Sequence, residues 1–357
     1  MIPENSSKTF SKKFLKQFTY GLSIAKALNY TAQGTLLPLV ERLANGQRNK
    51  DSKQFKENLQ MALPRVEKVL QQDADNIAAG YYPAQVIFQE NLLSHYWRVP
   101  KLLVDAYRAS KQRTQKKSDF FETKDSEFLN EVPEYFRRNF HFQKGGYLND
   151  DSAALYDHQV VVLFSGTAQA MRRQIIPKLK NHFNNSDGEG LRLLEVGCGT
   201  GSLTRSIALA FPKAQITCLD ISPHYLKQAQ KNLSAFKRIN FVQGMGEDLP
   251  FKDCSFDAVF SCYLFHELPE KIRTQVLEEK IRVLKYEGFM AVMDSIQKDD
   301  EPELNWALEQ FPKDFHEPFY KNYVENKIED FFVKLNLVEV STDLAFLTKI
   351  VSGKKSI

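Results

Sequence analysis

The spacing of hydrophobic residues divides the chain into two parts with different periodicities. In the first part, apolar residues recur every three to four positions in 14–43, 59–70 and 86–107, which predicts helices up to about residue 125. From Leu191 onward, short apolar runs alternate with amphipathic segments, as in a mostly parallel sheet covered by helices. We therefore expect an all-α N-terminal domain followed by an α/β domain.

In the C-terminal part, the apolar runs predict the order of strands and helices. Strands are predicted at Leu191–Val196, Gln215–Leu219, Ile239–Gln243, Phe256–Ser261 and Phe289–Met293, and the segments 331–341 and 344–351 fit a closing antiparallel hairpin. Helical spacing after the first strand (Leu203, Ile207, Phe211), after Ser222-Pro223, and over 271–284 supplies the connecting helices.

Polar and turn-rich segments mark the expected domain boundaries. Residues 118–134 are acidic and loop-like and predict a hinge, and 184–190 (NNSDGEG) predicts a linker. Between them, a cap at Asp150 or Asp151 predicts a helix through Tyr156 to Met171. The chain thus divides into a helical N-terminal domain (1–134), a lid and linker helix (135–185) and an α/β domain (186–357).

Two features of the helical part have more than one interpretation. Pro64 and Pro100 are expected to start or kink helices. An aromatic group predicts a packed core, and a substrate-pocket wall is the alternative: Tyr81, Tyr82, Phe88, Tyr96 and Trp97.

A glycine-rich turn follows the first predicted strand of the α/β domain. Gly197, Gly199 and Gly201 allow a sharp bend and close approach of a ligand, and the next helix directs free backbone N–H groups at it. Asp220 follows about twenty residues later at the end of the second strand, where an acid accepts hydrogen bonds from a ribose. Glu195, just before the glycines, suits a cationic ligand better than a pyrophosphate.

The run E-V-G-C-G-T-G (195–201) resembles the first motif of class I S-adenosylmethionine-dependent methyltransferases. The resemblance implies a Rossmann-like fold with S-adenosylmethionine as cofactor, the acid and glycines at its amino acid end, and Asp220 at its ribose hydroxyls. The segment GMGEDLPF (244–251) is similar to the ubiquinone/menaquinone-methyltransferase-like branch, although Met245 replaces an acid that reaches the adenine. Adenine contact would then fall to backbone groups of Met245 and Gly246. The remaining cofactor contacts are assigned to Ile221, Glu247 and Cys262.

The resemblance also implies a segment that folds over the cofactor and a substrate side. Lid candidates are Tyr147, Tyr156, His158 and Gln159, with packing against the sheet as the alternative. Candidates for catalysis are His266, His316 and Tyr320, with Asp294 beside them; a histidine that packs or caps the next helix is the alternative for His266. Phe265-His266-Glu267 and Phe315-His316-Glu317 form two similar histidine-acid pairs.

Composition and charge narrow the function classes. Cys198, Cys218, Cys254 and Cys262 form no C-x-x-C pair, so we expect neither a metal site nor disulfides. The net charge is +4, and the basic stretch 108–117 lacks interleaved aromatics, so nucleic-acid binding is not expected. Without a long apolar run or a signal-peptide pattern, we expect a cytoplasmic protein with no membrane span.

These observations favour an enzyme that methylates a small-molecule acceptor by in-line transfer. A protein or RNA methyltransferase that docks its target on the helical domain is one alternative. A methyltransferase fold that binds the cofactor without turnover is another. The acceptor atom and the oligomeric state are left open by the sequence.

Overall fold

The α/β part of the chain is built on one twisted seven-stranded sheet. The computed structural model describes residues 4–45, 52–89, 92–115, 129, 132–138, 140–142 and 145–357. The strand order is β3-β2-β1-β4-β5-β7-β6. The strands are β1 (Arg192–Val196), β2 (Gln215–Asp220), β3 (Ile239–Gln243), β4 (Phe256–Cys262), β5 (Leu284–Ser295), β6 (Leu337–Ala345) and β7 (Thr348–Lys355). Strands β1 to β5 pair in parallel, and β7 pairs antiparallel with both β5 and β6. The predicted α/β sheet with a terminal antiparallel hairpin is confirmed.

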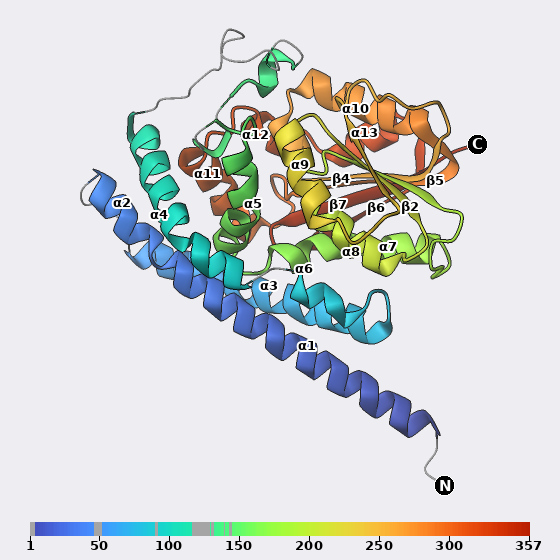
Figure 1. The fold of residues 1–357 in the computed structure, drawn as a ribbon, viewed down its shortest axis with the longest axis horizontal. Helices are drawn as coiled ribbons and strands as arrows, with labels where there is room; N and C mark the ends of the chain where they lie inside the picture. The colour runs from blue at the N-terminus through green and yellow to red at the C-terminus, as the bar shows by residue number, and fades with distance from the viewer. Residues whose placement is uncertain are drawn as a thin grey trace.

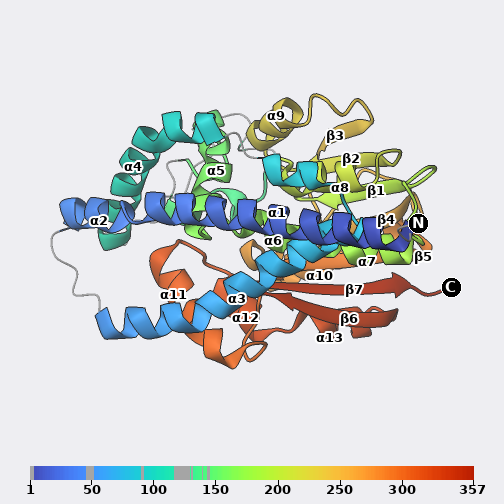
Figure 2. The ribbon, with the colours of Figure 1, turned by 90° about the horizontal axis from the view of Figure 1, so that it is seen from below.

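Helices cover both faces of the sheet (Figure 1). The N-terminal helices are α1 (Glu4–Gly34), α2 (Leu37–Asn45), α3 (Ser52–Ala79) and α4 (Leu92–Gln115). Those that follow are α5 (Asp150–Leu163), α6 (Ala168–Arg173), α7 (Ile175–His182), α8 (Ser202–Ala210), α9 (Pro223–Asn232), α10 (Glu270–Val283), α11 (Asn305–Asp314), α12 (Tyr320–Glu325) and α13 (Ile328–Lys334). The N-terminal helices form a further layer, in which α3 contacts α6 and α1 packs along α3, as the view in Figure 2 shows. Helix α5 contacts α1, α4 and α9. Helix α5 therefore joins the helical layer to the sheet.

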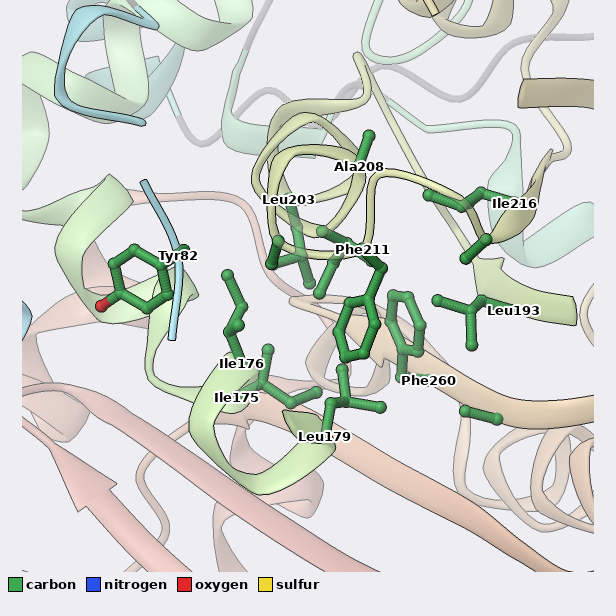
Figure 3. Close-up of a cluster of buried hydrophobic side chains, with 14 of the residues drawn as sticks. Tyr82, Ile175, Ile176, Leu179, Leu193, Leu203, Ala208, Phe211, Ile216 and Phe260 are labelled. Atoms are coloured by element: carbon green, nitrogen blue, oxygen red, sulfur yellow. The ribbon is translucent and has the colours of Figure 1, made fainter. Parts of the chain in front are cut away.

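The alternation of side chains along β1 divides the core into two clusters. Leu193 packs with α7 and α8 on one face, and Leu194 and Val196 pack with α10 on the other. Figure 3 shows the first of these clusters, in which Tyr82 lies beside the side chains of α7. The N-terminal helices are thus packed onto the core of the sheet, although the exact domain boundaries stay a prediction.

The lid helix is shorter than the sequence suggested. Asn149, and not Asp150 or Asp151, caps α5, because its side chain accepts a hydrogen bond from the backbone N–H of Ser152 at 2.7 Å. The helix ends at Leu163 and does not reach Met171. The break contains Gly166 at φ +80°, where an added Cβ would lie 3.0 Å from the Cα of Ala27 in α1. The absence of a side chain at Gly166 lets α1 approach the chain closely. Because Gly166 adopts a left-handed backbone conformation, the helix cannot continue through it.

Other sequence-based expectations need correction as well. The segment 331–341 was expected to form the first closing strand, but its first residues belong to α13, which buries Ile328 and Phe332 at helical spacing. The two strands of the hairpin are β6 and β7, which begin later in the chain. Pro64 and Pro100 lie inside α3 and α4, so they do not start these helices, and a kink at each stays a prediction. The expected aromatic core is wrong for three members, Phe88, Tyr96 and Trp97, which are exposed, whereas Tyr82 is buried. The predicted hinge at 118–134 falls mostly outside the described residues.

Within the described residues, the structure contains no helix long and apolar enough to cross a membrane. The four cysteines are free.

Candidate functional site

The glycine-rich turn and Asp220 meet at the carboxyl ends of β1 and β2. Gly197 and Gly199 adopt φ values of +71° and +55°, which only glycine takes without strain. The carboxylate of Asp220 accepts a hydrogen bond from the backbone N–H of Gly199 at 2.7 Å and another from that of Ser222 at 2.9 Å. Burial raises the pKa of Asp220 to about 6, although these two backbone bonds act in the opposite direction. The turn therefore fixes the carboxylate of Asp220 at the edge of a cavity. Gly197, Gly199, Asp220 and Ile221 all line this cavity.

The third glycine has a different position. Gly201 precedes α8 with a φ of +80° and does not line the cavity. A Cβ at this position would lie 2.6 Å from the side chain of Leu233 at the end of α9. Gly201 thus serves the close packing of α8 against α9, and a cofactor contact from it stays a prediction.

Glu195 lies at the inner wall of the cavity. Its side chain is buried, and the hydroxyl of Thr204 on α8 donates a hydrogen bond to it. Burial raises the pKa of Glu195 to about 8, because the charged carboxylate is deprived of water. A cation that enters the cavity would compensate for this lost hydration.

Arg172 on α6 is the positive counterpart of Glu195 in the same cavity, and no sequence motif indicates it. Its side chain is buried, and its guanidinium lies 5.5 Å from the centre of the Tyr263 ring. Its Nη1 atom has no hydrogen-bond partner among the residues that the structure describes. A buried guanidinium nitrogen without an acceptor is costly, so an anionic ligand group would stabilise it.

The lid is hydrogen-bonded to the glycine-rich turn through Asp157 of α5. The hydroxyls of Thr200 and Ser202 each donate to Asp157 Oδ1 at 2.7 Å. Tyr135 and Glu247 also line the cavity, and the hydroxyl of Tyr135 donates a hydrogen bond to Glu247 at 2.6 Å. These contacts attach residues before β1 to the loops after β1 and β3, as expected of a segment that covers the cavity.

The structure brings most, but not all, of the expected residues to this cavity. Glu247, Gly246 and Cys262 line it, whereas Met245 does not and instead forms an isolated β-bridge with Asp248. Of the lid candidates, Tyr147 and Tyr156 line the cavity. The other two lid candidates point elsewhere: His158 contacts Gln33 at 2.7 Å, and Gln159 donates to Asp105 at 2.7 Å.

None of the three candidate catalytic residues lines the cavity. His266 is buried with its Nδ1 atom 2.6 Å from Asp294, and it does not line the cavity. Burial lowers the pKa of His266, but the charge and hydrogen bond of Asp294 outweigh this and raise it to about 9. Tyr320 packs against His266 and shares a hydrogen bond of 2.7 Å with Ser295. His316 has its pKa lowered by burial. A role for any of these residues in proton transfer stays a prediction.

The acid members of the two histidine-acid pairs come together, and sequence reasoning had favoured the histidines. Glu267 lines the cavity, and Glu317 is close to it across the ring of His141. Glu267 also accepts a hydrogen bond from the hydroxyl of Tyr147. The repeated F-H-E pattern was the available signal, but it did not indicate which side chain of each pair would face the site.

A second cavity of about 350 Å³ adjoins the lid on the side of the helical layer. Its wall is mainly apolar and is formed by α1, α2, α4, α5 and the end of α11, with Leu37, Leu102 and Phe315 among its residues. Tyr156 lines both this cavity and the first one. A cavity of this size accommodates the apolar body of a small molecule.

Comparisons with known proteins agree with this architecture. Residues 193–288 match the family model described as a methyltransferase domain. A fatty-acid O-methyltransferase from Mycolicibacterium smegmatis is 37% identical over 128 residues, which is 36% of this chain and 45% of that protein. A demethylmenaquinone methyltransferase from Lysinibacillus sphaericus is 31% identical over 111 residues, 31% of this chain and 47% of that protein. The chain thus spans less than half the length of these two relatives.

Similarity to a solved structure extends into the N-terminal helices. Human N-acetylserotonin methyltransferase, solved in complex with S-adenosylmethionine, superposes with a TM-score of 0.50 and 15% identity, covering 72% of this chain and 70% of that one. At this identity the likeness establishes the fold. Together with the family match and the strand order, it shows that residues 193–288 are a class I S-adenosylmethionine-dependent methyltransferase domain.

Proposed function

We propose that this chain is an enzyme that transfers a methyl group from S-adenosylmethionine to a small-molecule acceptor. The observation that carries the proposal is the pair of adjoining cavities that share Tyr156: one with the charged groups that suit the cofactor, the other mainly apolar. The names of the relatives, which include a fatty-acid and a quinone methyltransferase, agree with an acceptor of low polarity.

The residues of the first cavity fit the cofactor group by group. Glu195 and the unpaired nitrogen of Arg172 offer opposite charges to the ammonium and carboxylate of an amino acid. Asp220 offers carboxylate oxygens to the ribose hydroxyls, and Gly199, where an added Cβ would meet no atom within 4 Å, leaves room for close approach. When bound, S-adenosylmethionine supplies a methyl group that its sulfonium has already activated for displacement.

The chain's own contribution is then alignment and exclusion of water. The cavity wall on the lid side is aromatic, with Tyr135, Phe140, Tyr147 and Tyr156. The hydrogen bonds that Asp157 accepts from Thr200 and Ser202 hold α5 over the glycine-rich turn. Holding two reactants in line accounts for much of the rate enhancement in such transfers. If the acceptor is a hydroxyl, the carboxylate of Glu267, which lines the cavity, is a candidate to accept the proton that the hydroxyl loses.

The experiment that tests the proposal follows the methyl group. The full chain is incubated with methyl-labelled S-adenosylmethionine and a cell extract separated into small-molecule, protein and RNA fractions, with Asp220→Ala as the control protein. We expect label in a small molecule, identified by mass spectrometry, and none with the variant. Label in protein or RNA alone, or none in any fraction, would contradict a small-molecule acceptor.

A further inference from the structure

The residues at the wall between the two cavities form a group with the chemistry of a metal site. His141, Glu267 and Glu317 each place one possible ligand atom within 4.8 Å of the others. His141 lines the second cavity and Glu267 the first. The group therefore lies where an acceptor in one cavity would meet the cofactor in the other.

Glu317 is a buried carboxylate whose side-chain oxygens lack hydrogen-bond donors among the described residues. Its side chain is 0% exposed, and neither carboxylate oxygen accepts a hydrogen bond with good geometry from the residues that the structure describes. The imidazole of His141 lies beside it, with its Nδ1 atom 2.9 Å from Oε1. A buried carboxylate without hydrogen-bond donors is costly, and coordination to a cation is a common compensation.

The group combines two carboxylates with one imidazole, a set of donor atoms that suits a divalent transition-metal cation. The neighbouring His266 lies 2.6 Å from Asp294 and 3.8 Å from Glu267, so it borders the group without being one of its three members.

The surroundings of His141 also suit a metal ligand. Its Nε2 atom lies 2.8 Å from the hydroxyl of Tyr147, and that hydroxyl donates to Glu267. In metal sites the ring nitrogen that does not bind the ion usually donates to such a partner, which fixes the tautomer and the orientation of the ring. With Nδ1 directed at the ion, Tyr147 would be that partner.

We propose that His141, Glu267 and Glu317 bind a divalent first-row transition metal ion at the wall between the two cavities. One imidazole and two carboxylates suit Mn²⁺, Fe²⁺ or Zn²⁺ better than Mg²⁺ or Ca²⁺, which prefer oxygen ligands alone. Three protein ligands leave coordination positions open, as in catalytic metal sites. An oxygen atom of the acceptor can fill one of them, and this last step rests on the proposed function. The proposal departs from the sequence-based expectation of no metal site.

The experiment measures bound metal and needs no methyl transfer, so it can fail or succeed independently of the proposed function. The full chain is stripped with EDTA and dialysed against Mn²⁺, Zn²⁺ or, without oxygen, Fe²⁺, and against Mg²⁺ for comparison. Bound metal is counted by elemental analysis, and Mn²⁺ affinity is followed by electron paramagnetic resonance. We expect one transition-metal ion per chain and much weaker retention of Mg²⁺.

Variants decide whether the ion is held by the proposed residues. Glu317→Gln keeps the size of the side chain, and we expect it to weaken binding by about 100-fold or more, since loss of even an outer partner costs 10–100-fold. Tyr147→Phe should weaken it by about 10-fold or more for the same reason. His224→Gln, at a partly exposed histidine that pairs with Asp150, should leave binding unchanged. Circular dichroism confirms that each variant is folded. No stoichiometric binding of any ion, or equal binding by Glu317→Gln, would mean that the group holds only a proton.

Discussion

Replacement of Asp220 by alanine tests the assignment of the first cavity most directly. The acid lines the cavity with a carboxylate whose two oxygens already accept backbone N–H groups from Gly199 and Ser222. The lone pairs that remain are available for the two ribose hydroxyls. A hydrogen bond to a charged acceptor contributes about 1.5–3 kcal/mol, so loss of two should cost about 3–6 kcal/mol of binding free energy. This corresponds to a Kd that is roughly 150-fold higher at the lower limit.

The assay is isothermal titration calorimetry with S-adenosylhomocysteine, which avoids turnover. Asp343→Ala serves as the matched control, because this exposed acid on β6 contacts Lys178 and lies away from the cavity. Asp220→Ala also leaves two backbone N–H groups without their acceptor, so its melting temperature is measured alongside. A folded Asp220→Ala protein with the affinity of the Asp343→Ala control would refute the assignment of the ribose to this acid.

Three further predictions follow from buried groups. Because burial raises the pKa of Glu195 to about 8, the carboxyl must lose a proton to pair with the cofactor's ammonium; affinity should therefore rise from pH 6 to 8 by calorimetry, and Glu195→Gln should abolish the rise. Asp73→Ala removes the carboxylate that forms the buried ion pair with Arg173 and should cost about 3–5 kcal/mol in urea unfolding, whereas Asp75→Ala, at an exposed pair on the same helix, should cost about 1 kcal/mol or less. Gly201→Ala forces a residue at φ +80° against a side chain of α9 and should lower the melting temperature; an unchanged melting curve would contradict the close packing.

The parts of the fold that were predicted correctly are those whose signal is local. Strands β1 to β3 and the turn between β1 and α8 were located within a residue or so, because apolar runs bounded by glycines determine them from short sequence windows. The end of α5 could not be found in this way. It depends on Gly166, whose freedom from a side chain matters only because α1 packs against it. The exposed aromatic residues of α4, such as Trp97, were misjudged for the same reason: composition does not say which face is covered.

The residues of the candidate site also fall into those that local spacing indicates and those that only tertiary packing brings together. Glu195, Gly197, Gly199 and Asp220 follow one another around one turn and could be recognised from spacing. Arg172 carries no motif, and only the packing of α6 against α3, α5 and α8 brings it into the cavity.

The two F-H-E segments show how a pattern can indicate a site without indicating which of its side chains face the cavity. Both histidines were the natural candidates for proton transfer, since imidazole titrates near neutral pH. In the structure the Nδ1 atom of His266 lies 2.6 Å from Asp294, whose charge favours the protonated form of the ring, and a role for His266 in proton transfer stays a prediction. The acids are the residues that turn towards His141, which lies far upstream in the chain. If these three side chains hold a metal ion, the histidine-acid pairs supply carboxylate ligands, and His266 is a positioning residue that keeps Glu267 in place from a distance of 3.8 Å.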